Sequence, residues 1–240
     1  MFTNPEYRPM FAVDVERSSG RGNVAMMRYQ EALFAQLREA FATSRIDWDA
    51  CHREDLGDGV LVIAPQGVAK SSLIHPLAAD LAGRLRSYNR TAGDSTKIRI
   101  RMALHAGDVH VQDGRIVGRP LEVLARLLDA PPGREALRAA PESATVLLLV
   151  SQHVYEETVQ HGYPGIDPET FTKVRYTVKE TTGDAWLHLP GHHVVVPAGS
   201  SVADVLAGNP ANVQHNTVTG SGVMFNNQSG SQHIYGRDAR

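Results

Sequence analysis

Apolar residues along the first 190 positions recur with two different periods. Across residues 71–88 the leucines recur every four positions, which predicts an amphipathic helix. Across residues 98–104 apolar residues alternate with basic or small ones, which predicts a strand. The same patterns predict, in chain order, a strand at 9–15, a helix at 23–42, strands at 46–54 and 60–64, a helix at 71–88, strands at 98–104 and 108–112, a helix at 121–128, a strand at 145–150, a helix at 152–160, and strands at 174–180 and 185–189.

Turn and capping residues indicate how these elements join. Asn23 is the expected N-cap of the first helix. Gly57-Asp58-Gly59 separates two expected strands and predicts a hairpin. Thr181-Thr-Gly-Asp184 is the expected turn between the last two strands, which places Lys179 within the first of them. Strands mixed with helices in this order predict an α/β or α+β fold with helices packed on a sheet.

Composition narrows the class of protein. The 240 residues are 42% hydrophobic, enough for a core, and the net charge of -2 gives no basic field for DNA or RNA. Cys51 is the single cysteine, which excludes a disulfide framework and a zinc site built from several cysteines. No apolar run approaches the roughly 18 to 20 residues of a membrane span. A cytoplasmic location without a membrane partner is therefore expected.

The character of the chain changes after Pro190. Residues 191–212 are mostly small, polar or Gly/Pro-rich and predict a linker between a globular domain at 1–190 and a tail at 213–240. In the tail, residues 216–225 and 226–235 form a repeat, with Asn, Gly and aromatic residues in register. Stacked Asn and aromatic residues stabilise cross-β assemblies. The repeat resembles amyloid-signalling motifs, which implies a receptor with a matching motif; the alternative is a disordered polar tail.

Four segments of the globular part form a further pattern. Asp14 ends a predicted buried strand, and Asp58 lies in the Gly-Asp-Gly turn. Arg101-Met-Ala-Leu-His-Ala-Gly107 and a segment from Gly118 to Leu127 follow in order. In order and spacing these segments resemble the class III nucleotidyl cyclases over about residues 10–190. The resemblance implies an α+β fold with a ferredoxin-like, cyclase-type sheet, and conversion of a nucleoside triphosphate to a 3',5'-cyclic nucleotide and pyrophosphate.

The resemblance also implies a site shared by two subunits. Asp14 and Asp58 match the two aspartates that hold two Mg²⁺ or Mn²⁺ ions, an arrangement in which few carboxylates and phosphate oxygens surround a hard cation. Arg126 matches the arginine that stabilises the transition state, and Lys179 matches a phosphate-binding lysine. In this family the aspartates and the Arg/Lys pair come from different subunits, so a homodimer is implied.

Two positions are expected to select the base. Glu54, three residues before Gly57, and Arg115, three before Gly118, match the family's base-selecting positions. A carboxylate accepts from guanine N1–H and N2–H, and an arginine donates to O6 and N7, so the pair favours GTP. The same two side chains also suit a pyrimidine nucleotide or ATP, or pair with each other.

Two departures from the family support an alternative function. Glu122 stands where the family has an Asn that orients the ribose, and Arg17-Ser-Ser19 replaces a Gly-Phe-Thr/Ser motif. Despite this departure, Glu122 and Arg126 are the two candidate catalytic residues of the segment from Gly118 to Leu127. The alternative is a cyclase-fold module that binds nucleotide or oligomerises without turnover.

Overall fold

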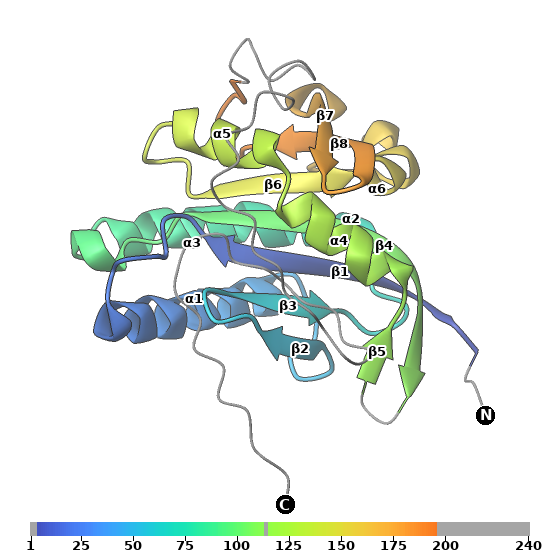
Figure 1. Ribbon diagram of the computed structural model, residues 1–240, viewed down its shortest axis with the longest axis horizontal. Helices are drawn as coiled ribbons and strands as arrows, with labels where there is room; N and C mark the ends of the chain where they lie inside the picture. The colour runs from blue at the N-terminus through green and yellow to red at the C-terminus, as the bar shows by residue number, and fades with distance from the viewer. Residues whose placement is uncertain (1–3, 113–114, 196–240) are drawn as a thin grey trace, which may run out of the picture.

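The computed structural model describes residues 4–112 and 115–195 of the chain. Within them, one mixed sheet of eight strands carries helices on both faces (Figure 1). The elements are β1 (Glu6–Val15), α1 (Asn23–Thr43), β2 (His52–Asp55), β3 (Gly59–Ile63), α2 (Lys70–Ser72), η1 (Leu73–Ala78), α3 (Ala79–Asn89), η2 (Asp94–Thr96), β4 (Ile100–Gln112), β5 (Arg115–Val117), α4 (Arg119–Leu128), α5 (Pro131–Ala139), β6 (Val146–Ser151), α6 (Gln152–Glu157), η3 (Val159–His161), η4 (Pro168–Thr170), β7 (Thr172–Val178) and β8 (Thr181–His188).

The order of the strands places β1 and β4 at the centre of the sheet. The order is β2-β3-β1-β4-β6-β8-β7, and β5 pairs with the end of β4. β4 and β6 run parallel, whereas the other pairs are antiparallel. The connection between the parallel strands carries α4 and α5, as a parallel crossover requires. The expected α+β class, with helices packed on a sheet, is confirmed.

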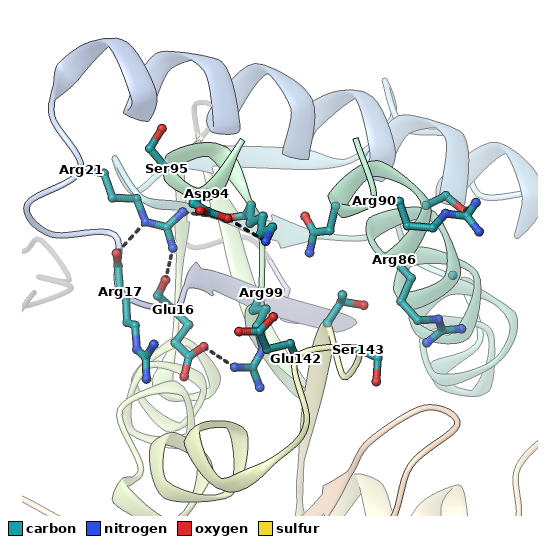
Figure 2. Close-up of a pocket in the computed structure, with 15 residues that line it drawn as sticks. Glu16, Arg17, Arg21, Arg86, Arg90, Asp94, Ser95, Arg99, Glu142 and Ser143 are labelled. Carbon is teal, nitrogen blue, oxygen red and sulfur yellow. Dashed lines mark hydrogen bonds and ion pairs between the residues drawn. The ribbon is translucent and has the colours of Figure 1, made fainter. Parts of the chain in front are cut away.

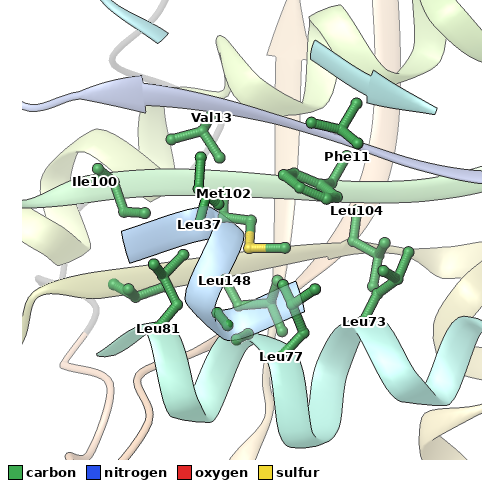
Figure 3. Close-up of a cluster of buried hydrophobic side chains, with 14 of the residues drawn as sticks. Phe11, Val13, Leu37, Leu73, Leu77, Leu81, Ile100, Met102, Leu104 and Leu148 are labelled. Carbon is green, nitrogen blue, oxygen red and sulfur yellow. The ribbon is translucent and has the colours of Figure 1, made fainter. Parts of the chain in front are cut away.

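One face of the sheet packs against α1, η1 and α3. Alternate residues of β1, including Phe11 and Val13, meet Leu37 of α1 and the leucines predicted to form one helix face (Figure 3). Each of these side chains is at most 1% exposed. Burying a side chain of this size contributes about 1.5–3 kcal/mol, so this layer is a main source of the fold's stability.

The other face of the sheet packs against α4 and α5. Met10 and Ala12 alternate with the residues of the first core and contact this second layer, together with Leu124 of α4 and Leu137 of α5. Because strand residues alternate between faces, Asp14 points to the same side as Met10 and Ala12. The predicted metal aspartate therefore lies on the α4 side of the sheet.

The first predicted hairpin strand begins later than expected. Residues 46–51 form a turn, and β2 starts at His52. Asp47 causes this turn, because its Oδ1 accepts hydrogen bonds from the backbone N–H groups of Asp49 (2.9 Å) and Ala50 (3.3 Å). The apolar Trp48 is buried against Phe41, with ring centroids 4.8 Å apart, rather than within a strand.

The first two predicted helices also differ in detail. Asn23 is the first residue of α1, not its N-cap; Gly22 holds that position with a φ of 81°. The helix predicted at 71–88 is interrupted at His75, whose backbone is extended (φ -139°, ψ 124°). Pro76 follows and lacks the N–H that a continuous helix needs. The leucine periodicity survives because the helical segments on both sides pack on the same face of the sheet.

The strands predicted at 98–104 and 108–112 are one strand, β4, that passes through Gly107. The glycine serves packing rather than a turn, because a Cβ there would lie 2.6 Å from Cγ of Pro120. The return strand is β5.

The helix α5 was not predicted from the sequence. It begins with Pro131 and Pro132, and prolines are tolerated in a first helical turn because the N–H groups there have no helical partner.

The last hairpin turns at Lys179 and Glu180 instead of Thr181–Asp184. Thr181 pairs with Val178, and Gly183 pairs with Tyr176 inside the hairpin. A Cβ on Gly183 would lie 3.3 Å from the Tyr176 ring, so this glycine makes room for an aromatic side chain. Lys179 has a φ of 54° and lies in the turn, not within a strand as expected.

The predicted domain boundary lies near the end of the described residues. After β8, Leu189 and His192 form an isolated bridge, and residues 196–240 lie outside the described part of the chain. Most of the predicted 191–212 linker and the whole 213–240 repeat tail thus stay predictions. Among the described residues, no helix is both long and apolar enough to cross a membrane.

Candidate active site

Asp14 and Asp58 lie at the same end of two paired strands. Asp14 is the next-to-last residue of β1, and its register partner on β3 is Gly59. The backbone N–H of Val15 donates to the carbonyl of Asp58 at 3.1 Å, which fixes the two aspartates relative to each other. Gly59 permits this approach, because a Cβ there would lie 1.7 Å from the carbonyl oxygen of Val13. The structure therefore brings the two predicted metal ligands together.

Arg101 is the immediate partner of Asp14. The two residues are opposite each other in the register of β1 and β4. Arg101 Nε donates to Asp14 Oδ1 at 2.9 Å, and Nη2 donates to Oδ2, so the ion pair is bidentate. Sequence analysis placed Arg101 at the head of its motif without identifying this contact. The contact follows from the register between β1 and β4, and a single sequence does not specify the register of strands so far apart along the chain.

Ser18 holds the second aspartate. Its Oγ donates to Asp58 Oδ2 at 2.7 Å from the loop that follows β1. This loop contains the departure at Arg17-Ser-Ser19, so the altered motif still contacts the carboxylate expected to bind metal. The hydroxyl fixes one carboxylate oxygen of Asp58 in place.

The environment of Asp14 disfavours its charged form. Burial raises the pKa of this carboxyl above its usual value, and the nearby negative charge of Asp58 raises the pKa further. Arg101 acts in the opposite direction, through its charge and its hydrogen bonds, and Arg134 lowers the pKa as well. A bound cation would offset the effect of Asp58 on the ionisation of Asp14.

Arg126 lies on α4 between two carboxylates. Its Nη2 is 3.5 Å from Glu122 Oε1, one helical turn away, and 3.4 Å from Glu180 Oε1 in the β7–β8 turn. The Arg126 side chain is 16% exposed, whereas Glu122 is 56% and Glu180 75% exposed. The Nε atom of Arg126 is buried without a hydrogen-bond partner within the described part of the chain. The guanidinium thus keeps an unused donor despite its two acidic neighbours.

A further carboxylate, Asp129, links the two halves of the site electrostatically. Arg134 donates to Asp129 Oδ1 at 2.8 Å. Burial raises the pKa of Asp129, and the positive charges of Arg134, Arg101, Lys179 and Arg126 lower it, in that order. The arginine that binds Asp14 and the two predicted phosphate-contacting cations therefore act on one partly buried acid at the end of α4. Sequence analysis did not single out Asp129 or Arg134.

The two predicted base-selecting residues are not in contact within one chain. Glu54 lies on β2 and pairs with His52, with 3.0 Å between Oε1 and Nε2. Arg115 is exposed on β5, which pairs with the far end of β4. The described residues contain no ion pair between Glu54 and Arg115, so neither neutralises the other.

Two other chemistries are disfavoured by the structure. Cys51 is buried, and burial raises the pKa of its thiol to about 11, so the nucleophilic thiolate is scarce at neutral pH. Within residues 4–112 and 115–195, no group of three or more His, Cys, Asp or Glu side chains could hold a metal ion by itself.

Solved structures similar to this chain are nucleotidyl cyclase domains. An adenylate/guanylate cyclase/hydrolase from Silicibacter pomeroyi matches with a TM-score of 0.56 at 18% identity, over 78% of this chain and 98% of that one. The chain has the fold of a class III nucleotidyl cyclase domain. The non-canonical dimeric guanylyl cyclase domain of the RhoGC fusion protein from Blastocladiella emersonii matches with a TM-score of 0.52 at 18% identity. The match covers 78% of this chain and 98% of that one.

A third similar structure is the guanylate cyclase domain of RhGC from Catenaria anguillulae in complex with GTP. It matches this cyclase-fold domain with a TM-score of 0.50 at 15% identity, over 77% of this chain and 97% of that one. No family model matches the sequence, and no curated protein matches it. At these identities the likeness concerns the fold alone.

Proposed function

We propose that this cyclase-fold domain converts a nucleoside triphosphate to a 3',5'-cyclic nucleotide and pyrophosphate at the interface of a homodimer. The observation that carries the proposal is the placement of Asp14 and Asp58 side by side at the end of β1 and β3, on a fold shared with nucleotidyl cyclases. Placing Asp58 where its charge opposes the ionisation of Asp14 is electrostatically unfavourable, which supports a functional role for the pair.

The residues present fit a magnesium or manganese requirement. Two neighbouring carboxylates match the way Mg²⁺ is held, by one or two carboxylates together with substrate phosphates. Asp14 and Asp58 would hold the ions, and Ser18 keeps one oxygen of Asp58 oriented. When bound, such ions supply positive charge to the triphosphate and acidify the attacking 3'-hydroxyl.

The arginines and the lysine of the site carry the remaining roles. Arg101 neutralises Asp14 in the substrate-free chain, and its guanidinium becomes available when cations replace it at that carboxylate. Arg126 stabilises charge that develops on the α-phosphoryl group, for which its unpartnered Nε is a free donor. Lys179 projects from the exposed β7–β8 turn and binds phosphate oxygens. A second subunit provides Arg126 and Lys179 to the aspartates of the first.

Base selection is assigned to Glu54 and Arg115. They do not pair with each other in one chain, and Glu54 would exchange its contact with His52 for one with the nucleotide base. Their donor and acceptor pattern favours GTP, with a pyrimidine nucleotide and ATP as the alternatives. A similar structure contains GTP, in agreement with this preference.

An assay of all four nucleoside triphosphates tests the proposal. The full chain is incubated with Mn²⁺ and then Mg²⁺, and cyclic product is identified by chromatography and mass spectrometry. Production of one cyclic nucleotide above the level of an Asp58→Asn blank is expected, with GTP the preferred substrate. Binding of Mn²⁺ and nucleotide by a confirmed dimer, without product from any of the four, would favour the alternative of a non-catalytic nucleotide-binding module.

Replacement of Glu122 by Asn is expected to raise turnover. Glu122 lies 3.5 Å from Arg126 and places a negative charge where the triphosphate approaches. Asn removes that charge and supplies the amide found in the resembled family, and we expect an increase of about tenfold in kcat, which is about 1.4 kcal/mol in barrier height. The matched control is Glu31→Gln, an exposed acid on α1. Turnover equal to that of the control would contradict the expected inhibition by Glu122, and lower turnover would show that Glu122 assists the reaction.

A further inference from the structure

A pocket adjoins the loop that follows β1, and neither Asp14 nor Asp58 lines it. Its volume is about 860 Å³. It is bordered by the loop after β1, the C-terminal half of α3, η2, the start of β4 and the segment before β6 (Figure 2). A pocket of this size accommodates a small ligand.

The charges that line this pocket are mainly positive. Six basic and three acidic residues line it, although the whole chain has a net charge of -2. Two of the acids are already neutralised: Glu16 pairs with Arg99 at 3.0 Å, and Asp94 pairs with Lys97 at 2.8 Å. Four arginines that line the pocket form no ion pair with a carboxylate within the described part of the chain; they are Arg17, Arg21, Arg86 and Arg90.

Arg21 is fixed in the wall of the pocket by backbone carbonyls rather than by an ion pair. Its guanidinium donates to the backbone carbonyls of Arg17 (2.7 Å), Lys97 (2.6 Å) and Glu16 (2.6 Å). It also lies over the ring of Tyr29, 5.3 Å from the ring centroid. These contacts orient the group through neutral acceptors, and the nearby Glu16 is itself paired with Arg99, which leaves Arg21 oriented to bind an anion.

The other three arginines can adjust to a ligand. Arg17 is exposed and has a φ of 54°, a left-handed conformation that is uncommon outside glycine and concentrates at functional sites. Arg86 and Arg90, on α3, each make one long hydrogen bond, to the carbonyl of Pro190 (3.4 Å) and to Ser87 Oγ (3.3 Å). Figure 2 shows Arg17 and Arg21 on one side of the pocket and Arg86 and Arg90 on the other.

We propose that this pocket binds a compact polyanion with two or more phosphoryl groups, held between Arg17 and Arg21 on one side and Arg86 and Arg90 on the other. Guanidinium groups bind phosphoryl oxygens in a bidentate manner, and two opposed pairs match two separated anionic groups better than one. Serine hydroxyls at positions 87, 95 and 143 add neutral donors. No aromatic side chain is among the residues that line the pocket, so the phosphoryl groups and not a base are recognised.

Calorimetric titration of the full chain with inorganic pyrophosphate and tripolyphosphate tests this inference. EDTA is present, so that metal-dependent binding at Asp14 and Asp58 does not contribute. We expect the double variant Arg86→Ala/Arg90→Ala to weaken binding at least tenfold and higher ionic strength to weaken it in the wild type. Arg175→Ala, on the edge strand β7, is the control and should bind as the wild type does.

The ligand class is tested by comparison with nucleotides. A nucleoside triphosphate is expected to bind about as tightly as tripolyphosphate and to lose affinity in the same double variant. A preference of a hundredfold or more for the nucleotide would overturn the assignment, as would absence of pyrophosphate binding at millimolar concentration. If the double variant does not fold by circular dichroism, Arg17→Ala in the exposed loop replaces it. The measurement is independent of product formation, so a chain that makes no cyclic nucleotide can still bind the polyanion.

Discussion

Asp14→Asn is expected to lower the rate of cyclic nucleotide formation by about 1000-fold or more, because the charge that holds a divalent cation is lost. The amide keeps the shape of the carboxyl and still offers Oδ1 as an acceptor to Arg101, so the fold should persist. Product formation from the preferred nucleotide in the presence of Mn²⁺ is the measurement, with the dimer verified by light scattering.

The matched control for this variant is Asp108→Asn. Asp108 is exposed on β4, away from the ion pair that β4 makes through Arg101. Its replacement removes the same charge and should leave the rate within about twofold, as is usual for an exposed substitution away from a site. Activity of Asp14→Asn within tenfold of wild type would contradict the role given to this carboxylate.

Gly59→Ala is expected to cause the largest loss of stability. The added Cβ would lie 1.7 Å from the carbonyl oxygen of Val13, and the obstacle is backbone that cannot rotate away. Separation of β1 from β3 should lower the free energy of unfolding by about 3 kcal/mol or more. Urea denaturation followed by circular dichroism measures this change.

Gly83→Ala is the control for this second variant. Gly83 lies within α3, and the nearest atom to its added Cβ is Nη2 of the flexible Arg86 side chain, at 3.8 Å. Because alanine favours the helix, this variant should be up to about 1 kcal/mol more stable than the wild type. Equal unfolding free energies for the two variants would show that β1 and β3 can separate at Gly59 without cost.

The elements that a local pattern determines could be predicted from the sequence. The strand ending near Asp14 and the helix that begins at Asn23 depend on periodicity, and both are present. The continuous β4 and the last turn were predicted wrongly, because glycines were taken as turn signals. Gly107 and Gly183 instead make room for Pro120 and Tyr176, which are packing partners that the local sequence does not reveal.

In the candidate site, too, some features follow from local sequence and others from contacts between distant segments. The short motifs indicated Asp14 and Asp58, and the structure places them together. The bidentate contact of Arg101 with Asp14 depends on the pairing of strands 87 positions apart, which no local pattern specifies. The charges around Asp129 likewise come from four different places in the fold: α5, β4, the β7–β8 turn and α4. Sequence therefore indicates the chemical groups, whereas the fold determines which of them neutralise one another.

A mixture of two inactive variants tests the central claim most directly. Asp14→Asn and Arg126→Ala proteins are each assayed alone, then mixed, exchanged and assayed again. If every site takes its aspartates from one subunit and its arginine from the other, random exchange gives half heterodimers, each with one intact site of two, and about one quarter of wild-type activity returns. Activity that stays at the level of the separate variants, with heterodimers verified by mass spectrometry, would contradict a site shared between two copies of this chain.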